Sequence, residues 1–235
     1  MQHLQTTIYV LRNSRMKKLN VLVALLVVAL MAAPALAGTV VLPGLVNTGG
    51  TGVVGTPDSA YDILDGAPGG VTEAYEVAKP GVWVAAPAGS NWIGPDLLME
   101  DDNPATGPQG ALDNDPVGDY TYTLTFDVAA AYVPYLQITG KWATDNGATM
   151  KLNGTTLEWA TPYEGFRKLS AFTIASGFQN GENTLTFVVN NATGSGNPSG
   201  LLVCDLAAKV PEPASVAVWS VLCAIAGIAV WRRRK

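Results

Sequence analysis

The sequence predicts an all-β fold, a β-sandwich of the jelly-roll type, flanked by one helical segment at each end of the chain. Three observations predict it. Central segments alternate strictly between apolar and polar residues, which is the period of a half-buried strand. Turn dipeptides recur between these segments at short spacing. Outside the two ends, no segment has the apolar period of a helix of normal length. At this chain length, a jelly roll is the natural version of such a sandwich.

Residues 1–37 are expected to direct export. Two lysines precede an apolar stretch over residues 19–31, and Ala35 and Ala37 are the small residues of a cleavage site before Gly38. A positive segment, an apolar segment and a small-x-small site in this order are typical of a secretory signal peptide, with an N-terminal extension before it. Signal peptidase is therefore an expected partner. A retained membrane helix is the alternative.

The body is expected to contain two parts. Residues 38–80 are rich in Gly, Thr and Pro and predict an extended lead-in segment with early strands. Residues 81–209 predict the jelly-roll domain. Its clearest strands lie at 119–128, 135–144, 166–174, 183–192 and 199–210, and short stretches at 83–86 and 91–93 are candidates for two more.

The sequence predicts a two-faced strand and a hairpin turn in particular. In 119–128, Tyr, Leu, Phe and Val alternate with Thr and Asp, so one face of this strand is apolar and the other polar. Asn153-Gly154 lies between apolar positions, which predicts a tight hairpin turn.

Charge excludes one class of partner. All 19 acidic residues but only six of the 14 basic residues lie between the two basic ends, which leaves this part with a formal charge of −13. Such a surface repels phosphate backbones, so no nucleic-acid partner is expected. It suits cations, neutral polymers or simple solubility.

Catalysis has little support in the sequence. The single histidine is His3, so neither a Ser-His-Asp triad nor a histidine-bearing zinc site can form in the body. No Gly-x-Ser-x-Gly motif or phosphate-binding loop occurs. Cys204 lies in an apolar stretch and is expected to be a small buried residue. The chain is therefore expected not to be an enzyme.

One cluster allows two interpretations. The residues concerned are Trp142, Asp145, Asn146, Trp159 and Tyr163. In the structural interpretation, which we favour, the tryptophan belongs to the core and the Asp-Asn pair shapes a turn by bonding its own backbone. In the alternative, aromatic rings stack on a sugar and the polar side chains bond its hydroxyls.

An acidic stretch suggests a second candidate site, for binding a calcium ion as the metal. Calcium takes six to eight oxygen ligands, and carboxylates crowd the segment over residues 100–119. The candidate ligands are Asp101, Asp102, Asp113 and Asp115. The spacing is not that of an EF-hand, and a solvated acidic loop is the alternative that we favour. No other cofactor is expected.

The C-terminal residues 210–235 carry a three-part pattern. Pro211-Glu212-Pro213 precedes an uncharged apolar run at 214–230, and a basic tail follows. The tail contains Arg232, Arg233 and Arg234. The run is at the short limit of a membrane-spanning helix, and the positive tail predicts that the body lies outside the cytoplasm.

This arrangement resembles the PEP-CTERM sorting signal of exported proteins in Gram-negative bacteria. The resemblance implies a precursor that spans the inner membrane, and an exosortase that recognises it and cleaves it near Pro211. It also implies a final place at the cell surface or in the extracellular matrix, with a role in biofilm. A permanent single-pass anchor is the alternative.

The body resembles galactose-binding-like jelly-roll modules. The stretches that carry the resemblance are, in order, "NWIGPD", "GDYTYTLTFDV", "ITGKWATDNGATMKLNG" and "GFQNGENTLTFVVNNATGSGNPSGLLVCDL". The resemblance implies a non-catalytic module that binds carbohydrate, and in some members a structural calcium ion. The alternative is an acidic matrix protein with no discrete ligand, held by a retained C-terminal helix.

Overall fold

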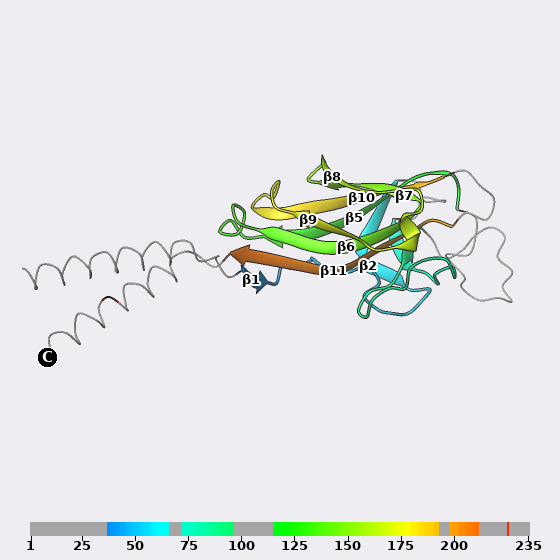
Figure 1. Ribbon diagram of the computed structural model, residues 1–235, viewed down its shortest axis with the longest axis horizontal. Coiled ribbons are helices and arrows are strands. Elements are labelled where there is room, and N and C mark those ends of the chain that lie inside the picture. The colour runs from blue at the N-terminus through cyan, green and yellow to red at the C-terminus, as the bar shows by residue number, and fades with distance from the viewer. Residues whose placement is uncertain (1–36, 66–71, 96–114, 193–197, 212–224, 226–235) are drawn as a thin grey trace, which may run out of the picture. The chain divides into compact units, whose positions relative to one another are not determined.

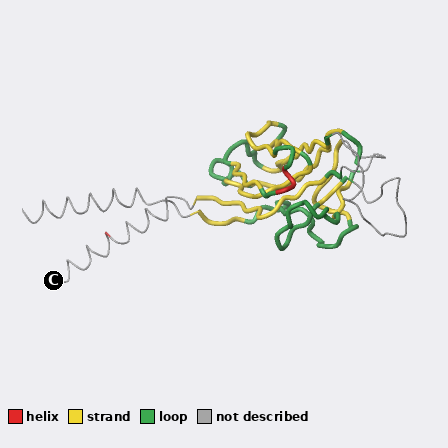
Figure 2. Tube along the Cα trace, turned by 45° about the vertical axis from the view of Figure 1, so that its right-hand side comes forward, coloured by secondary structure: helices red, strands yellow, loops and turns green. Residues whose placement is uncertain are grey.

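The computed structural model describes residues 37–65, 72–95, 115–192, 198–211 and 225. Residues 39–210 form one compact unit with its own hydrophobic core. The expected all-β class is confirmed, because this unit consists of strands and loops with a single short helical turn, η3 (Gly165–Arg167), among its described residues (Figure 2).

The described part of the chain contains eleven strands. They are β1 (Ala37–Val40), β2 (Pro57–Asp65), β3 (Glu73–Glu76), β4 (Ile93–Gly94), β5 (Gly118–Val128), β6 (Gln137–Asp145), β7 (Gly147–Leu152), β8 (Thr155–Thr161), β9 (Ser170–Ile174), β10 (Gly181–Asn191) and β11 (Gly200–Pro211). Their hydrogen-bonded order is β8-β7-β10-β5-β2-β3-β4-β11-β6-β9, and β1 pairs with β11. Figure 1 shows the longer strands side by side.

The sheet folds over so that two groups of strands face each other. The strands β8, β7, β10, β5 and β2 form one layer, and β11, β6 and β9 form the other. Between them the ring of Trp142 on β6 lies 5.7 Å from Phe187 on β10 and meets Phe172 on β9 edge to face at 6.5 Å. Burial of such large rings is the main source of stability in a core of this kind.

The predicted alternation in β5 is confirmed. Its apolar side chains are all buried, and its threonines and aspartates lie on the opposite face. β10 repeats this pattern in register with β5, with Leu185 opposite Leu124 and Phe187 opposite Tyr122. Two adjacent strands with the same period therefore give the layer one apolar and one polar face.

The predicted hairpin turn is also confirmed. Asn153 and Gly154 alone separate β7 from β8, with φ angles of 51° and 78°. Two consecutive residues with positive φ make a type I′ turn, whose twist matches that of the strands it joins.

The early strands expected within residues 38–80 take part in the sandwich itself. β2 pairs with β5, and β3 pairs with β2 and β4. Residues 83–86, a candidate strand, lie in a loop, whereas the stretch at 91–93 contributes to the two-residue strand β4.

A second, smaller core explains why that loop is ordered. Trp83 and Trp92 lie with their ring centroids 4.2 Å apart and are both buried. They pack on the outer face of the β11–β6 layer, against Ala143 and Leu202. The packing of these two rings, and not pairing with a neighbouring strand, determines the backbone path of this segment. The strand prediction at 83–86 was therefore wrong.

Both expected terminal helices fall outside the described residues, apart from Ile225. Where the structure describes the chain, it contains no helix with the length and apolar character needed to cross a membrane.

Candidate functional site

The outer face of the first layer is lined by threonines, and we call it the threonine face. Its hydroxyl-bearing side chains come from four adjacent strands. They are Thr121, Thr123 and Thr125 on β5, Thr184 and Thr186 on β10, Thr149 on β7 and Thr156 on β8. Thr123, in the middle, is buried at 5% exposure, and the other six are half-buried or exposed.

The strand register arranges these side chains in rows. One row runs across the layer from Thr156 through Lys151, Thr186 and Thr123 to Asp62 on β2. Parallel rows pair Thr184 with Thr125, and Thr149 with Val188 and Thr121. Neighbours within a row are about 4.8 Å apart, and successive rows are about 6.7 Å apart along the strands. The face is thus a two-dimensional array of hydroxyl groups that Lys151 and Val188 interrupt.

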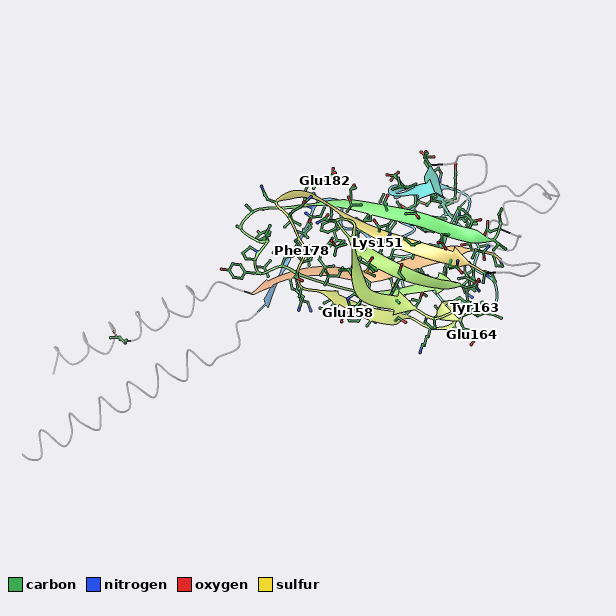
Figure 3. All side chains as sticks on the ribbon, turned by 90° about the horizontal axis from the view of Figure 1, so that it is seen from above. Lys151, Glu158, Tyr163, Glu164, Phe178 and Glu182 are labelled. Atoms are coloured by element: carbon green, nitrogen blue, oxygen red, sulfur yellow. The ribbon has the colours of Figure 1, made fainter. Side chains whose placement is uncertain are left out.

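Charged side chains lie around this array. Among the described outward-facing residues of these strands and of β3, six are carboxylates and one is a lysine. The carboxylates are Asp62, Glu73, Asp119, Asp127, Glu158 and Glu182, and the lysine is Lys151. In Figure 3, Lys151 lies between Glu182 and Glu158.

The residues that the sequence grouped as a sugar site do not meet at one exposed place. Trp142 is 1% exposed and lies in the main core. Its ring is covered by Phe172 and Phe187, so it offers no face to a ligand. This is the position that the structural interpretation expects for it.

Asp145 and Asn146 are buried at the end of β6. One carboxylate oxygen of Asp145 accepts the indole N–H of Trp83 at 2.7 Å, and the other accepts the side-chain amide of Asn146 at 2.6 Å. The side-chain amide oxygen of Asn146 in turn accepts the backbone N–H of Ala192 at 2.8 Å. Desolvation raises the pKa of Asp145 to about 6, and the two hydrogen bonds oppose this rise. The pair joins β6 to the small core and to the end of β10.

The two remaining aromatic residues lie apart from that pair. Trp159 on β8 is half-buried, and its indole N–H donates to the Thr173 carbonyl oxygen. Tyr163 is 60% exposed in the loop that follows β8, at the opposite end of the sandwich from Glu182 (Figure 3). Only Tyr163 presents most of its ring to solvent.

The candidate calcium ligands are mostly outside the described residues. Asp101, Asp102 and Asp113 lie there, and only Asp115 is described. Asp115 is buried, and its carboxylate accepts the backbone N–H of Ser199. In the described part of the chain, no three acidic, histidine or cysteine side chains are grouped so that they could hold a metal.

Two buried carboxylates that the sequence did not single out hold a glycine-rich loop. Glu76 accepts hydrogen bonds from the backbone and hydroxyl of Thr51 at 2.7 and 2.6 Å and from the Gly52 N–H at 3.0 Å. Asp58 accepts the Gly49 N–H at 2.7 Å, and its pKa is raised chiefly by burial. The loop residues lie up to 25 positions from these carboxylates in the sequence, so no local pattern could have identified these contacts.

The processing residues are described only where they meet the sandwich. Ala37 and Gly38 begin β1, and Pro211 ends β11. Ala35, Glu212, Pro213 and the three terminal arginines lie outside the described residues.

Comparisons with known proteins gave structural similarity alone. No family model matches the sequence, and no curated protein matches it. Among solved structures, a CBM35 from Paenibacillus barcinonensis is 14% identical, with coverage of 62% of this chain and 92% of that chain and a TM-score of 0.32. A family 35 carbohydrate-binding module from Clostridium thermocellum is 10% identical, with coverage of 66% and 95% and a TM-score of 0.33. A family 29 carbohydrate-binding module complexed with cellulohexaose is 10% identical, with coverage of 74% and 91% and a TM-score of 0.34.

Proposed function

We propose that this chain is an exported, surface-sorted β-sandwich of the jelly-roll type that binds a polysaccharide without cleaving it, through its threonine face. The observation that carries the proposal is the array of hydroxyl groups on β5, β10, β7 and β8. Each threonine hydroxyl can donate one hydrogen bond and accept two, which matches the hydroxyl groups of sugars.

The geometry of the array suits a polymer. A chain that lies across the strands meets one side chain about every 4.8 Å, so many weak hydrogen bonds form along its length. Each such bond contributes only about 1 kcal/mol, because it replaces a bond to water. Affinity therefore depends on the number of sugars in contact.

The buried carboxylates support a non-catalytic role. Asp58, Glu76, Asp115 and Asp145 each accept hydrogen bonds from backbone or side-chain groups of the chain itself. Acids and bases in glycoside hydrolysis must reach the substrate from two sides of the scissile bond. Carboxylates that instead hold loops and strand ends act as structural acceptors.

The ends of the chain support export and sorting. The signal-peptide pattern ends where β1 begins, and the Pro-Glu-Pro motif starts at Pro211, the last residue of β11. We infer that signal peptidase and an exosortase act as processing partners, and that the membrane helix belongs to the precursor. The acidic body then remains at the cell surface or in the matrix, where a polysaccharide is at hand.

The test uses residues 38–210, which contain the whole compact unit. Binding to a panel of soluble polysaccharides, with the producing organism's own exopolysaccharide included, is measured by affinity electrophoresis and calorimetry. The double variant Thr184→Val, Thr186→Val removes two hydroxyls and keeps the β-branched shape. We expect it to weaken binding at least about tenfold, since two hydrogen bonds of about 1 kcal/mol are lost.

Thr173→Val is the matched control. Thr173 is exposed on β9 in the other layer, so its hydroxyl is outside the threonine face. Equal binding by wild type and the double variant would overturn the face as the site. Absence of binding to every polysaccharide would overturn the proposed function and favour a matrix protein without a discrete ligand.

A further inference from the structure

The charges around the threonine face point to the class of polysaccharide. We propose that the face selects uncharged polysaccharides and excludes polyanions such as polyuronates. This inference rests on the proposed function, because it concerns the same site. It deepens that function by naming the chemical class of the ligand.

Carboxylates occupy every margin of the array. Asp127 and Glu182 lie directly opposite each other at one end of β5 and β10, and Asp119 lies at the other end of β5. On the β2 side, Asp62 faces Glu73 in the register with β3. A polymer that lies along β5 and β10, or along the row from Thr156 to Asp62, therefore passes a carboxylate.

Two of these contacts are unfavourable for the fold. Like charges directly opposite each other on adjacent strands destabilise the pairing of those strands. This applies to Asp127 with Glu182 and to Asp62 with Glu73. Among the described residues, neither pair has a salt-bridge partner. Folding gives no reason for the pairs, whereas repulsion of an anionic ligand does.

The fourth side of the array is closed by β8. Glu158 projects outward from this edge strand, on the same face as Thr156. Lys151 is the one described cation on the threonine face, and it lies within the row that runs from Thr156 to Asp62. A single cation among six carboxylates leaves the local potential negative.

The expected discrimination follows from Coulomb's law. Two like charges a few ångströms apart repel each other even in water, so several carboxylates along a polyanion give a large repulsion. Salt screens it over about 10 Å at 0.1 M. A neutral polymer feels almost none of this field, and its hydrogen bonds to threonine do not depend on salt.

The experiment measures the affinity of residues 38–210 for a neutral set (glucomannan, xyloglucan, galactan and dextran) and a polyanionic set (polygalacturonate and alginate). Each polymer is titrated at low and at high sodium chloride, with a chelator present to prevent bridging by divalent cations. We expect a neutral polymer to bind with an affinity that changes less than about twofold with salt. We expect either polyanion to bind measurably but far more weakly than the neutral polymers at low salt.

A charge variant tests the cause. Asp127→Asn with Glu182→Gln removes two negative charges at one margin, and we expect polyanion binding at low salt to rise at least about threefold. Neutral-polymer affinity should stay within about twofold. The control is Glu164→Gln, in the exposed loop after β8, which removes a carboxylate outside the threonine face together with its ion pair to Arg167 and should change neither affinity.

The outcomes separate this inference from the function on which it rests. Binding of a neutral polymer, together with weak polyanion binding that strengthens at high salt, supports both this inference and the proposed function. Polyanion binding at low salt that equals or exceeds neutral binding overturns the selection for uncharged polymers and leaves polysaccharide binding intact. An unchanged polyanion affinity in the charge variant overturns the carboxylates as its cause. Absence of binding to both sets overturns the proposed function itself.

Discussion

The indole nitrogen of Trp159 lies 3.0 Å from the carbonyl oxygen of Thr173 and donates a hydrogen bond to it. Trp159 is on β8 and Thr173 is on β9, the two strands at opposite ends of the hydrogen-bonded strand order. The ring is half-buried and packs against the main core. One side chain therefore links the two free edges of an otherwise open sheet.

Replacement of this tryptophan should weaken the fold. In Trp159→Phe the indole N–H is lost and most of the apolar surface stays, so we expect the free energy of unfolding to fall by about 1 kcal/mol. Urea unfolding followed by circular dichroism measures it. Tyr163→Phe removes a polar atom from an exposed ring nearby and should leave stability unchanged. Loss of polysaccharide binding in Trp159→Phe at unchanged stability would instead favour the sugar-stacking hypothesis for this residue.

Asp145 should make the protein less stable as the pH rises. Its pKa in the folded chain is about 6, above the ordinary value of an aspartate of about 3.9. Between these two values the folded state binds more protons than the unfolded state. The free energy of unfolding therefore falls from about pH 4 to about pH 6 and is level above that range.

The variant Asp145→Asn isolates this contribution. The amide stays neutral at every pH and can still accept the N–H of Trp83, so the fall should be smaller than in wild type. Some slope remains, because the pKa of Asp58 is also raised by burial. Urea unfolding at several pH values gives the two curves. Parallel curves for wild type and variant would show that Asp145 does not titrate differently on folding.

Glu76 and Glu73 form a matched pair on one strand. Glu76 is fully buried and accepts bonds from Thr51 and Gly52, whereas Glu73 is exposed opposite Asp62. Glu76→Gln places an amide where acceptors are needed, and we expect a loss of about 1.5–3 kcal/mol in unfolding free energy. Glu73→Gln removes a like-charge contact and should be neutral or slightly stabilising. Equal effects of the two changes in thermal melts would contradict the structural role of Glu76.

Replacement of Asn183 should destabilise the fold more than replacement of any other polar residue in the turn that leads into β10. It is completely buried, and its side chain makes four hydrogen bonds, to Gln179 twice, to Gly181 and to Asn153. Asn183→Ala leaves several buried groups without partners, so we expect a loss of about 2–4 kcal/mol. Asn180→Ala, at an exposed position in the same turn, is the control. A melting temperature within error of wild type for Asn183→Ala would refute this role.

The sequence allowed much of the strand content to be predicted, because a period of two is a local property. β5, β10 and the Asn153-Gly154 hairpin follow directly from it. The order of the strands does not, since it depends on contacts between distant residues. Thr48, for example, bonds the backbone of Val203, 155 positions away.

The candidate site was harder to predict than the fold. Trp142 and Trp159 look alike in sequence, yet one is enclosed by the core and the other lies at a sheet edge. Aromatic side chains serve cores and ligand sites equally well, so composition cannot separate the two roles. The threonine face was visible only as the polar half of an alternating strand. Its extent depends on the register between β5, β10, β7 and β8, which no single segment contains.

The last strand of the sandwich lies inside the sheet and not at its edge. β11 is hydrogen-bonded to β6 and to β4, and it supplies Leu201 and Val203 to the main core. A growing chain without residues 200–210 therefore has no partner for one side of β6, and its core is incomplete. Contacts between such distant segments also slow folding, because the loop between them must first be closed. For the exported protein that we propose, this dependence on the last strand keeps the polypeptide from folding stably until its body has almost entirely crossed the membrane.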